Sequence, residues 1–140
     1  MGEATGLVGD VMRRDFVSLT PGDNMLEAER IMRLGRIRHL PIVESNRLVG
    51  VLSHRDLMES SLASVLDVPM EDRIAHLRST PIERVMRRDP WTVETDTPLR
   101  EAAMRMLNLK IGCLPVVEPA GTVVGLITES DLLLAAYQPG

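Results

Sequence analysis

Apolar residues recur along the chain in two patterns, one with helical spacing and one as short continuous runs. Helical spacing occurs at 25–32 and again at 99–107, which predicts two helices that each bury one apolar face. The continuous runs do not alternate strictly with polar residues and come in two pairs: 40–43 with 48–52, and 114–117 with 123–127. Such runs are typical of strands with little exposure, so each pair predicts two buried strands joined by a turn.

The two halves of this pattern are copies of each other. Three motifs occur twice in the same order, 74 or 75 residues apart: Val-Met-Arg-Arg-Asp at 11–15 and 85–89, Leu-Pro-Ile-Val and Leu-Pro-Val-Val at 40–43 and 114–117, and Gly-x-x-(Ser/Thr)-x-x-Asp at 50–56 and 125–131. The offset changes from 74 to 75 in the turn between the paired strands. Because exposed turns tolerate insertions, this change supports an internal repeat.

Each copy is predicted to have the order β-α-β-β-α. A short helical piece is expected to end at the paired arginines, where cations suit a helix C-terminus. The paired arginines are expected to be solvated there, and the alternative is that they line a phosphate-facing cleft. Short first strands are expected at 16–19 and 91–93, and the last helix of each copy is expected to begin at Ser53 or Thr128. The sequence therefore predicts an α/β (α+β) fold with small mixed sheets flanked by helices.

Capping residues are expected to set the ends of the long helices. Asp23 and Thr97 have side chains suited to an N-cap, and Pro98 suits the first helical position. Gly35 lies where the first long helix should end.

The repeat divides the chain into a first copy at 1–57, an intervening segment at 58–80 and a second copy at 81–140. The intervening segment has helical apolar spacing that Pro69 interrupts, and it is too apolar for a flexible linker. We expect it to pack on the module or on a second subunit. Neither copy is expected to close a core alone, so the two should pack face to face with pseudo-twofold symmetry.

Composition and charge exclude several classes of protein. Hydrophobic residues make up 44% of the 140 residues but aromatic residues only 2%, and the net charge is −4. A mildly acidic chain is poorly suited to bind nucleic acid. Cys113 is the single cysteine, which excludes an intramolecular disulfide and favours a reducing compartment. No apolar run suits a membrane span and no signal peptide is evident, so we expect a cytoplasmic protein with no membrane partner.

The Gly-x-x-(Ser/Thr)-x-x-Asp motif predicts a strand that runs directly into a helix. A helix N-terminus presents free N–H groups and the positive end of its dipole, which suits an anionic ligand. The hydroxyl residue and the acid three positions later also match a capping box, which satisfies those N–H groups without a ligand. Spacing alone favours the capping box, so both interpretations stay open at this point.

Other reactive side chains lack partners in the sequence pattern. His39 and His54 have no neighbours at metal-ligand spacing, and we expect surface or pocket-wall histidines and no metal site. Cys113 opens an apolar run and is expected to be a small buried hydrophobe. With no nucleophile–base pair in view, we predict no catalytic residues.

The ordered repeat over about residues 8–137 resembles a tandem pair of cystathionine-β-synthase (CBS) domains, also called a Bateman module. The resemblance implies a non-enzymatic regulatory module that binds an adenosine-containing ligand such as AMP, ADP, ATP, S-adenosylmethionine or NAD in clefts between the two copies. It also implies a disc-shaped homodimer that needs no cofactor. These 140 residues leave no room for an enzyme, channel or transporter domain beside the pair, so we expect an effector to be a separate protein.

The resemblance further implies which residues bind the nucleotide. The motif acids would bind ribose hydroxyls, the motif hydroxyl residues would lie near ribose or phosphate, and residues of the other strands would surround the base. In chain order these positions are Ser18, Arg38, His39, Pro41, Ser53, Asp56, Thr92, Gly112, Cys113, Pro115, Thr128 and Asp131.

The two copies differ in charge around the motif. The first copy has Arg38, His39 and Arg55 where the second has Gly112, Cys113 and Ser130. Arginine offers a forked and permanently charged set of donors. If each site draws on its own copy, the first should prefer phosphorylated ligands and the second less charged or cationic ones. The alternative is a structural adaptor with unoccupied clefts that binds a partner protein, and an enzyme ranks third.

Overall fold

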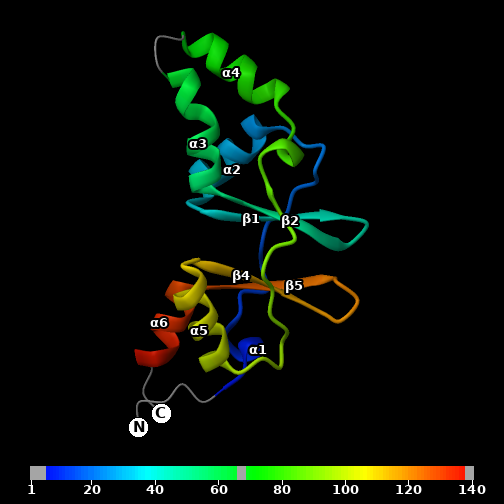
Figure 1. Ribbon diagram of the computed structural model, residues 1–140, viewed down its shortest axis with the longest axis vertical. Helices are drawn as coiled ribbons and strands as arrows, with labels where there is room; N and C mark the ends of the chain where they lie inside the picture. Colours follow the sequence, from blue (N-terminus) through cyan, green and yellow to red (C-terminus); the bar gives the residue numbers. More distant parts are fainter. Residues whose placement is uncertain (1–5, 66–68, 138–140) are drawn as a thin grey trace. The chain divides into compact units, whose positions relative to one another are not determined.

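The computed structural model describes residues 6–65 and 69–137, with the side chains of 61–65 left aside, and the chain divides into two compact units (Figure 1). One unit, called the Asp56 unit below, spans Val17–Pro90. The other, called the Asp131 unit, combines Met1–Phe16 with Trp91–Gly140. The predicted division at residues 57 and 81 follows the sequence repeat, whereas each compact unit takes its Val-Met-Arg-Arg segment from the other copy.

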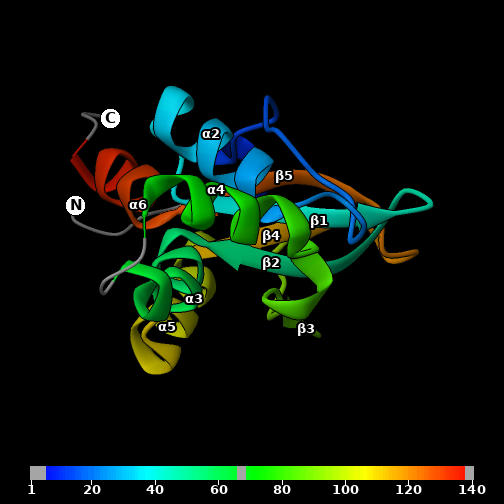
Figure 2. The ribbon, with the colours of Figure 1, turned by 90° about the horizontal axis from the view of Figure 1, so that it is seen from above.

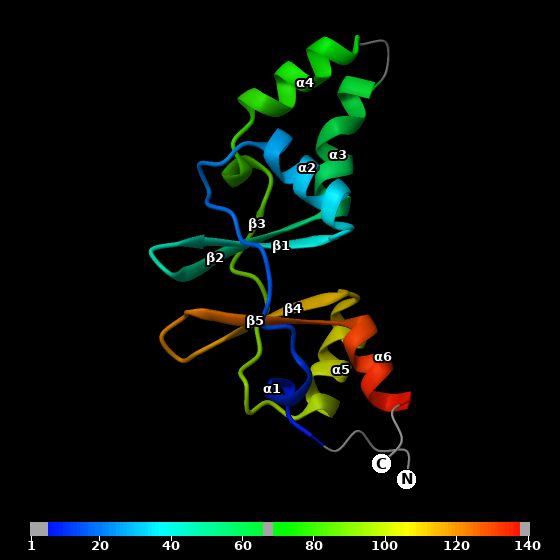
Figure 3. The same ribbon diagram turned by 180° about the vertical axis from the view of Figure 1, so that it is seen from behind.

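The Asp56 unit has a three-stranded antiparallel sheet in the order β1-β2-β3. Its strands are β1 (His39–Glu44), β2 (Arg47–Ser53) and β3 (Arg87–Arg88). Its helices are α2 (Met25–Gly35), α3 (His54–Val65), α4 (Met70–Ser79) and the 3₁₀ turn η1 (Ile82–Arg84). Figures 1 and 3 show α2 and α3 on one face of the β1–β2 hairpin, and Figure 2 shows β3 beside β2.

The Asp131 unit has a two-stranded antiparallel hairpin covered by helices. Its strands are β4 (Cys113–Val117) and β5 (Val123–Thr128), and its helices are α1 (Val8–Val11), α5 (Leu99–Leu109) and α6 (Glu129–Tyr137). The hairpins, the long helices and the separate helix α4 confirm those elements of the prediction. Leu66, which also carried the helical spacing, lies outside the described residues.

Each unit has a buried core of its own, but neither core is built from one sequence copy alone. The Val-Met-Arg-Arg segments are exchanged between the copies. Val8 and Met12 are buried in the core of the Asp131 unit, and Ile82 and Met86 are buried in the core of the Asp56 unit. The apolar residues around each Val-Met-Arg-Arg segment therefore complete the core of the opposite copy.

The expected first strands at 16–19 and 91–93 are reduced to single parallel bridges. Leu19 bonds with Pro41 and Val43 across one bridge, through its N–H at 3.2 Å and its carbonyl at 2.8 Å. Extending the ladder by one pair would need the N–H of the residue at 41, and proline has none. Val93 and Pro115 repeat the arrangement, so the strand prediction was wrong in length for the same reason in both copies.

The helix ends differ from the predicted caps by one residue. Asn24 caps α2, with its Oδ1 accepting a bond from the Glu27 N–H at 2.9 Å. Asp23 instead closes the preceding turn by accepting bonds from Thr20. Pro98 is the N-cap of α5, while the Thr97 hydroxyl accepts a bond from Glu94 in the turn.

The C-terminal ends of α2 and α5 rely on a left-handed residue that is not glycine. Gly35 is the last helical residue, and Arg36 follows it at φ 53°. Lys110 ends α5 in the same way at φ 56°. The prediction that Gly35 ends the helix was therefore displaced by one position, since the left-handed cap falls on the next residue.

The paired arginines also lie beyond the helix ends where they were expected. Arg13 bridges Leu126 of β5, and Arg87 and Arg88 form β3 against β2. Both arginine segments are extended here because each pairs with the second strand of a hairpin. This pairing determines where the arginine side chains lie.

Candidate functional site

The motif acid Asp56 closes a capping box at the start of α3. Its Oδ2 accepts bonds from the Ser53 N–H at 3.0 Å and from the Ser53 hydroxyl at 2.8 Å. The Asp56 N–H donates back to the Ser53 Oγ at 3.1 Å. Asp56 is only 8% exposed, so the local sequence fixes a nearly buried carboxylate at the point where β2 becomes a helix.

Asp131 repeats this geometry at the start of α6. Its Oδ2 accepts bonds from the Thr128 N–H and hydroxyl, both at 2.9 Å, and its own N–H donates to the Thr128 Oγ1 at 3.3 Å. Asp131 is 6% exposed. The capping-box interpretation is therefore correct for both copies.

Further N–H groups at these helix ends are also engaged. The His54 N–H donates to the Arg38 carbonyl at 2.7 Å, and the Glu129 N–H donates to the Gly112 carbonyl at 3.1 Å. The expectation that these ends offer free N–H groups to an anion needs correction, because the motif side chains and the preceding carbonyls satisfy several of them.

Each motif acid also receives an arginine from the Val-Met-Arg-Arg segment of the opposite copy. The Arg87 Nε lies 3.4 Å from the Asp56 Oδ1, and the Arg13 Nε lies 2.9 Å from the Asp131 Oδ1. Both arginine side chains stay largely exposed, at 65% and 60%. These arginines were expected at solvated helix ends, with a phosphate-facing cleft as the alternative. Their pairing with the motif acids was not predicted, although their recurrence at a constant offset was a signal.

The motif glycines allow the arginine segments to come this close. A Cβ built on Gly50 would lie 2.9 Å from the Arg87 carbonyl oxygen, and one on Gly125 would lie 2.8 Å from the Arg13 carbonyl oxygen. Backbone atoms at such distances leave no room for a side chain. The glycine at the start of the motif is therefore linked to the arginine that reaches the acid at its end.

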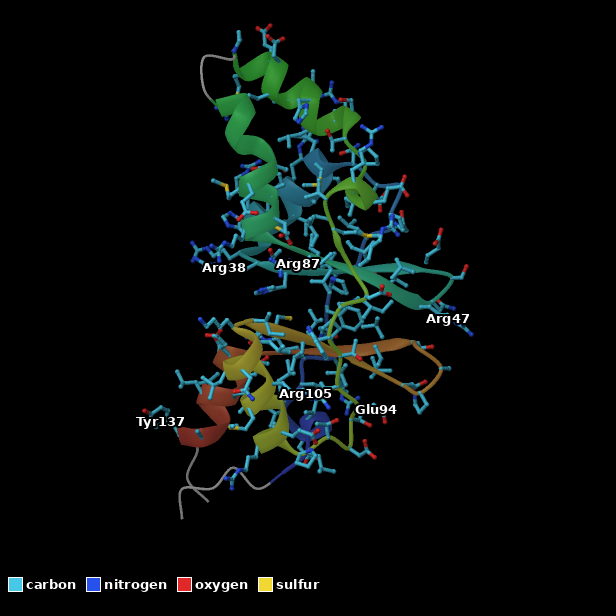
Figure 4. All side chains as sticks on the ribbon, viewed as in Figure 1. Arg38, Arg47, Arg87, Glu94, Arg105 and Tyr137 are labelled. Atoms are coloured by element: carbon cyan, nitrogen blue, oxygen red, sulfur yellow. The ribbon has the colours of Figure 1, made fainter. Side chains whose placement is uncertain are left out.

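The structure gathers only part of the predicted nucleotide set around each acid. Arg38 is exposed and His39 half-buried at the start of β1, and Figure 4 labels Arg38 and Arg87 at the level of the same sheet. Arg55 is exposed, and its Nε lies 3.4 Å from the Oε1 of Glu59, one turn further along α3.

The remaining predicted residues are split between the surface and the core. Ser18 is exposed, while Pro41 and Pro115 are buried and use their carbonyls to hold Leu19 and Val93. The Thr92 carbonyl accepts a bond from the Arg105 Nη1 at 2.8 Å.

Cys113 is buried at the start of β4 and has no features of a nucleophile. Burial, with a smaller contribution from the charge of Asp131, raises the pKa of its thiol from 9.0 to about 12. The thiol is therefore protonated at neutral pH, which matches the expectation of a small buried hydrophobe.

Three other features of the described residues bear on function. Nowhere in 6–65 and 69–137 do three His, Cys, Asp or Glu side chains come together in a way that could hold a metal ion. Across the same residues, no helix combines the length and apolar character needed to cross a bilayer. A surface groove in the Asp56 unit runs along α2, from Asn24 to Ile37, and none of the predicted nucleotide-binding residues lines it.

Comparison with known proteins assigns the family. The sequence matches the CBS domain twice, over residues 8–63 and 82–137. The chain therefore belongs to the CBS domain family and contains two copies of the domain. It is 30% identical to a CBS domain-containing protein of Dictyostelium discoideum, across 91% of this chain and 88% of that protein. It is also 30% identical to inosine-5′-monophosphate dehydrogenase of Korarchaeum cryptofilum, but spans only 26% of that enzyme.

Solved structures show the same fold. AcuB from Vibrio cholerae has a TM-score of 0.79 at 35% identity, over 93% of this chain and 90% of that one. CBSX2 of Arabidopsis thaliana, solved in complex with AMP, has a TM-score of 0.79 at 26% identity, over 94% and 96%. The CBS domain pair of protein MJ0100, solved with 5′-methylthioadenosine and S-adenosyl-L-methionine, has a TM-score of 0.77 at 27% identity, over 93% and 94%.

Proposed function

We propose that this chain is a non-enzymatic regulatory module that binds an adenosine-containing ligand beside the motif acids. The ligand is an AMP- or ATP-type nucleotide, with S-adenosylmethionine or NAD as further candidates of the same class. Binding changes the shape or pairing of a homodimer, and a separate effector protein responds to that change. Such a shift requires the ligand to bind one state better than the other.

The hydrogen bonding of the motif acids is the observation that carries this proposal. A carboxylate can accept about four hydrogen bonds. The Asp56 carboxylate already accepts two from Ser53 and one from Arg87, and Asp131 is bonded in the same way by Thr128 and Arg13. Each acid therefore has room for at most one further donor, at Oδ1, and a ribose hydroxyl is a donor of suitable size.

Structural relatives support the chemical class of the ligand. CBSX2 was solved with AMP, and the MJ0100 domain pair with 5′-methylthioadenosine and S-adenosyl-L-methionine. The ligands in both structures contain adenosine but differ in charge at the 5′ position. The shared adenosine moiety is therefore what we extend to this chain, while the 5′ group stays open.

Apolar side chains on α6 support the proposed pairing of two chains. Leu133, Leu134 and Tyr137 are all exposed, and Figure 4 shows Tyr137 projecting from the end of the helix. A second copy would cover such side chains and remove them from water.

Thermal unfolding with added ligands tests the proposal. A ligand that binds only the folded state, at 100 times its dissociation constant, adds about 2.7 kcal/mol of stability. For a chain of this size we expect the melting temperature to rise by about 5–15 °C with at least one of AMP, ATP, NAD and S-adenosylmethionine. Asp56→Ala and Asp131→Ala should each remove the part of the rise that comes from its own site.

Asp23→Ala is a matched control for the loss of a local carboxylate. Asp23 also accepts bonds from an N–H and a hydroxyl three residues earlier, at 2.8 and 3.0 Å, but it lies in a turn outside the motif. This variant should melt lower yet keep the full ligand-induced rise. If millimolar amounts of all four ligands leave the melting temperature of the parent chain unchanged, the proposal fails and the structural adaptor becomes the better account.

A further inference from the structure

The two arginine–acid pairs, Arg87 with Asp56 and Arg13 with Asp131, have a consequence for ligand choice. We infer that Arg13 and Arg87 are specificity-determining residues that make the motif sites select anionic over neutral adenosine ligands. The inference rests on the proposed function, because it concerns the same two acids. It differs from the charge difference seen between the copies in the sequence, since both sites now hold an arginine at the same position.

The first step is that ligand and arginine would share one oxygen atom. In each unit Oδ2 accepts two bonds from the capping hydroxyl residue, so a further donor has to approach Oδ1. Oδ1 is the atom that the Arg87 or Arg13 Nε contacts, at 3.4 and 2.9 Å. Two donors on one oxygen are neighbours, so a bound ribose would lie directly beside the guanidinium.

The second step is that the guanidinium has donors to spare. Arginine carries five N–H donors in a planar fork, and the Nε makes the contact to each acid. More than half of each arginine side chain is exposed. The terminal N–H groups can therefore reach a phosphate or carboxylate attached to the ribose, in the bidentate geometry that arginine favours.

The third step is that a neutral ligand gains nothing from this charge. Adenosine offers hydroxyl groups to an acid that the arginine already neutralises, so sharing Oδ1 weakens an existing charge-assisted bond. A nucleotide pays the same penalty but adds a charge-assisted bond to the guanidinium, which is worth about 10- to 150-fold in affinity. Removal of the arginine should therefore lower the affinity for AMP and leave the affinity for adenosine unchanged or higher.

The adjacent arginines provide matched controls. Arg14 and Arg88 belong to the same segments and carry the same charge, but the Arg14 Nη2 donates to the Gly9 carbonyl at 3.2 Å and Arg88 pairs through its backbone with Gly50. The double variant Arg13→Ala/Arg87→Ala and the control Arg14→Ala/Arg88→Ala therefore lose equal net charge. A difference between them reports the position of the charge and not its amount.

Calorimetric titration of AMP and of adenosine into the full chain and both double variants tests the inference. We expect the ratio of the two dissociation constants to shift against AMP by about 10- to 150-fold in Arg13→Ala/Arg87→Ala, and by less than about threefold in the control. The double variant Arg13→Lys/Arg87→Lys keeps the charge but lacks the planar, forked set of donors. It should restore part of the parent's preference for AMP over adenosine. The single variants then assign the effect to the Asp56 or the Asp131 unit.

The contradicting outcomes are distinct. An unchanged ratio, an equal loss for both ligands, or the same shift in variant and control would overturn the specificity role while leaving the proposed function standing. If the parent chain binds neither AMP nor adenosine at millimolar concentration, this inference fails, and the proposed function fails with it only if ATP, NAD and S-adenosylmethionine do not bind either. Circular dichroism of each variant shows that it is folded before titration.

Discussion

The motif glycines give the sharpest test of how the arginines reach the acids. Gly50→Ala would place a Cβ 2.7 Å from the Met86 Sδ and 2.9 Å from the Arg87 carbonyl oxygen. Met86 is almost fully buried in the core of the Asp56 unit, and the second contact is to backbone, so neither atom can yield without moving the segment. Forced insertion of a methyl group into packed structure costs about 1–3 kcal/mol.

This cost can be measured by urea unfolding and by thermal melting. At about 140 residues, a loss of 1–3 kcal/mol corresponds to a fall in melting temperature of about 3–10 °C. Gly125→Ala should behave alike, because its Cβ would lie 2.8 Å from both the Arg13 carbonyl oxygen and the Met12 Sδ. Gly22→Ala is the control: a Cβ there meets nothing within 4 Å, so we expect no loss and up to about 1 kcal/mol of gain.

The result that would refute this reasoning is simple to recognise. If Gly50→Ala and Gly125→Ala are as stable as the parent within about 0.5 kcal/mol, the Val-Met-Arg-Arg segments do not cross the hairpins at the described distance. The pairing of arginine with acid in each unit would then lose its structural basis.

Three further predictions concern assembly, folding and pH. Light scattering at micromolar concentration should give about twice the 15.5 kDa of one chain, and a single-chain mass would argue against the homodimer. The fragment 1–78 should show no cooperative unfolding, since it lacks Ile82 and Met86 from its core; a sharp transition would show that these residues are dispensable. The raised pKa of Cys113, about 12 against 9.0, stabilises the fold fully below pH 9 and progressively less as the pH approaches 12. The free energy of unfolding, measured with urea across that pH range, should therefore fall more steeply for the parent than for Cys113→Ala. Parallel curves for the two proteins would contradict the raised pKa of Cys113.

The hairpins, long helices and capping boxes could be predicted from the sequence because short segments encode them. Leu40–Val43 and Leu114–Val117 each carry a buried strand in four residues. Ser53 and Thr128 precede their acids by the three positions that a capping box needs. No distant part of the chain had to be known.

The exchange of the Val-Met-Arg-Arg segments could not be predicted in the same way. Both segments have the same four residues, and both hairpins offer a glycine at the matching position, so either segment suits either copy locally. Which one pairs with which depends on long-range packing, and Arg13 and Arg87 were assigned to helix ends as a result. The shortened first strands were a different case, because Pro41 and Pro115 were visible in the sequence and their missing N–H groups limit the ladder.

The central claim, an adenosine ligand held at the motif acids, is tested most directly by native mass spectrometry of the intact protein with AMP added. We predict peaks that carry AMP on the parent chain and on Asp23→Ala, and their loss from the double variant Asp56→Ala/Asp131→Ala. A parent chain that stays free of AMP, ATP, NAD and S-adenosylmethionine alike at millimolar concentration, or a double variant that binds AMP as well as the parent does, would contradict the account.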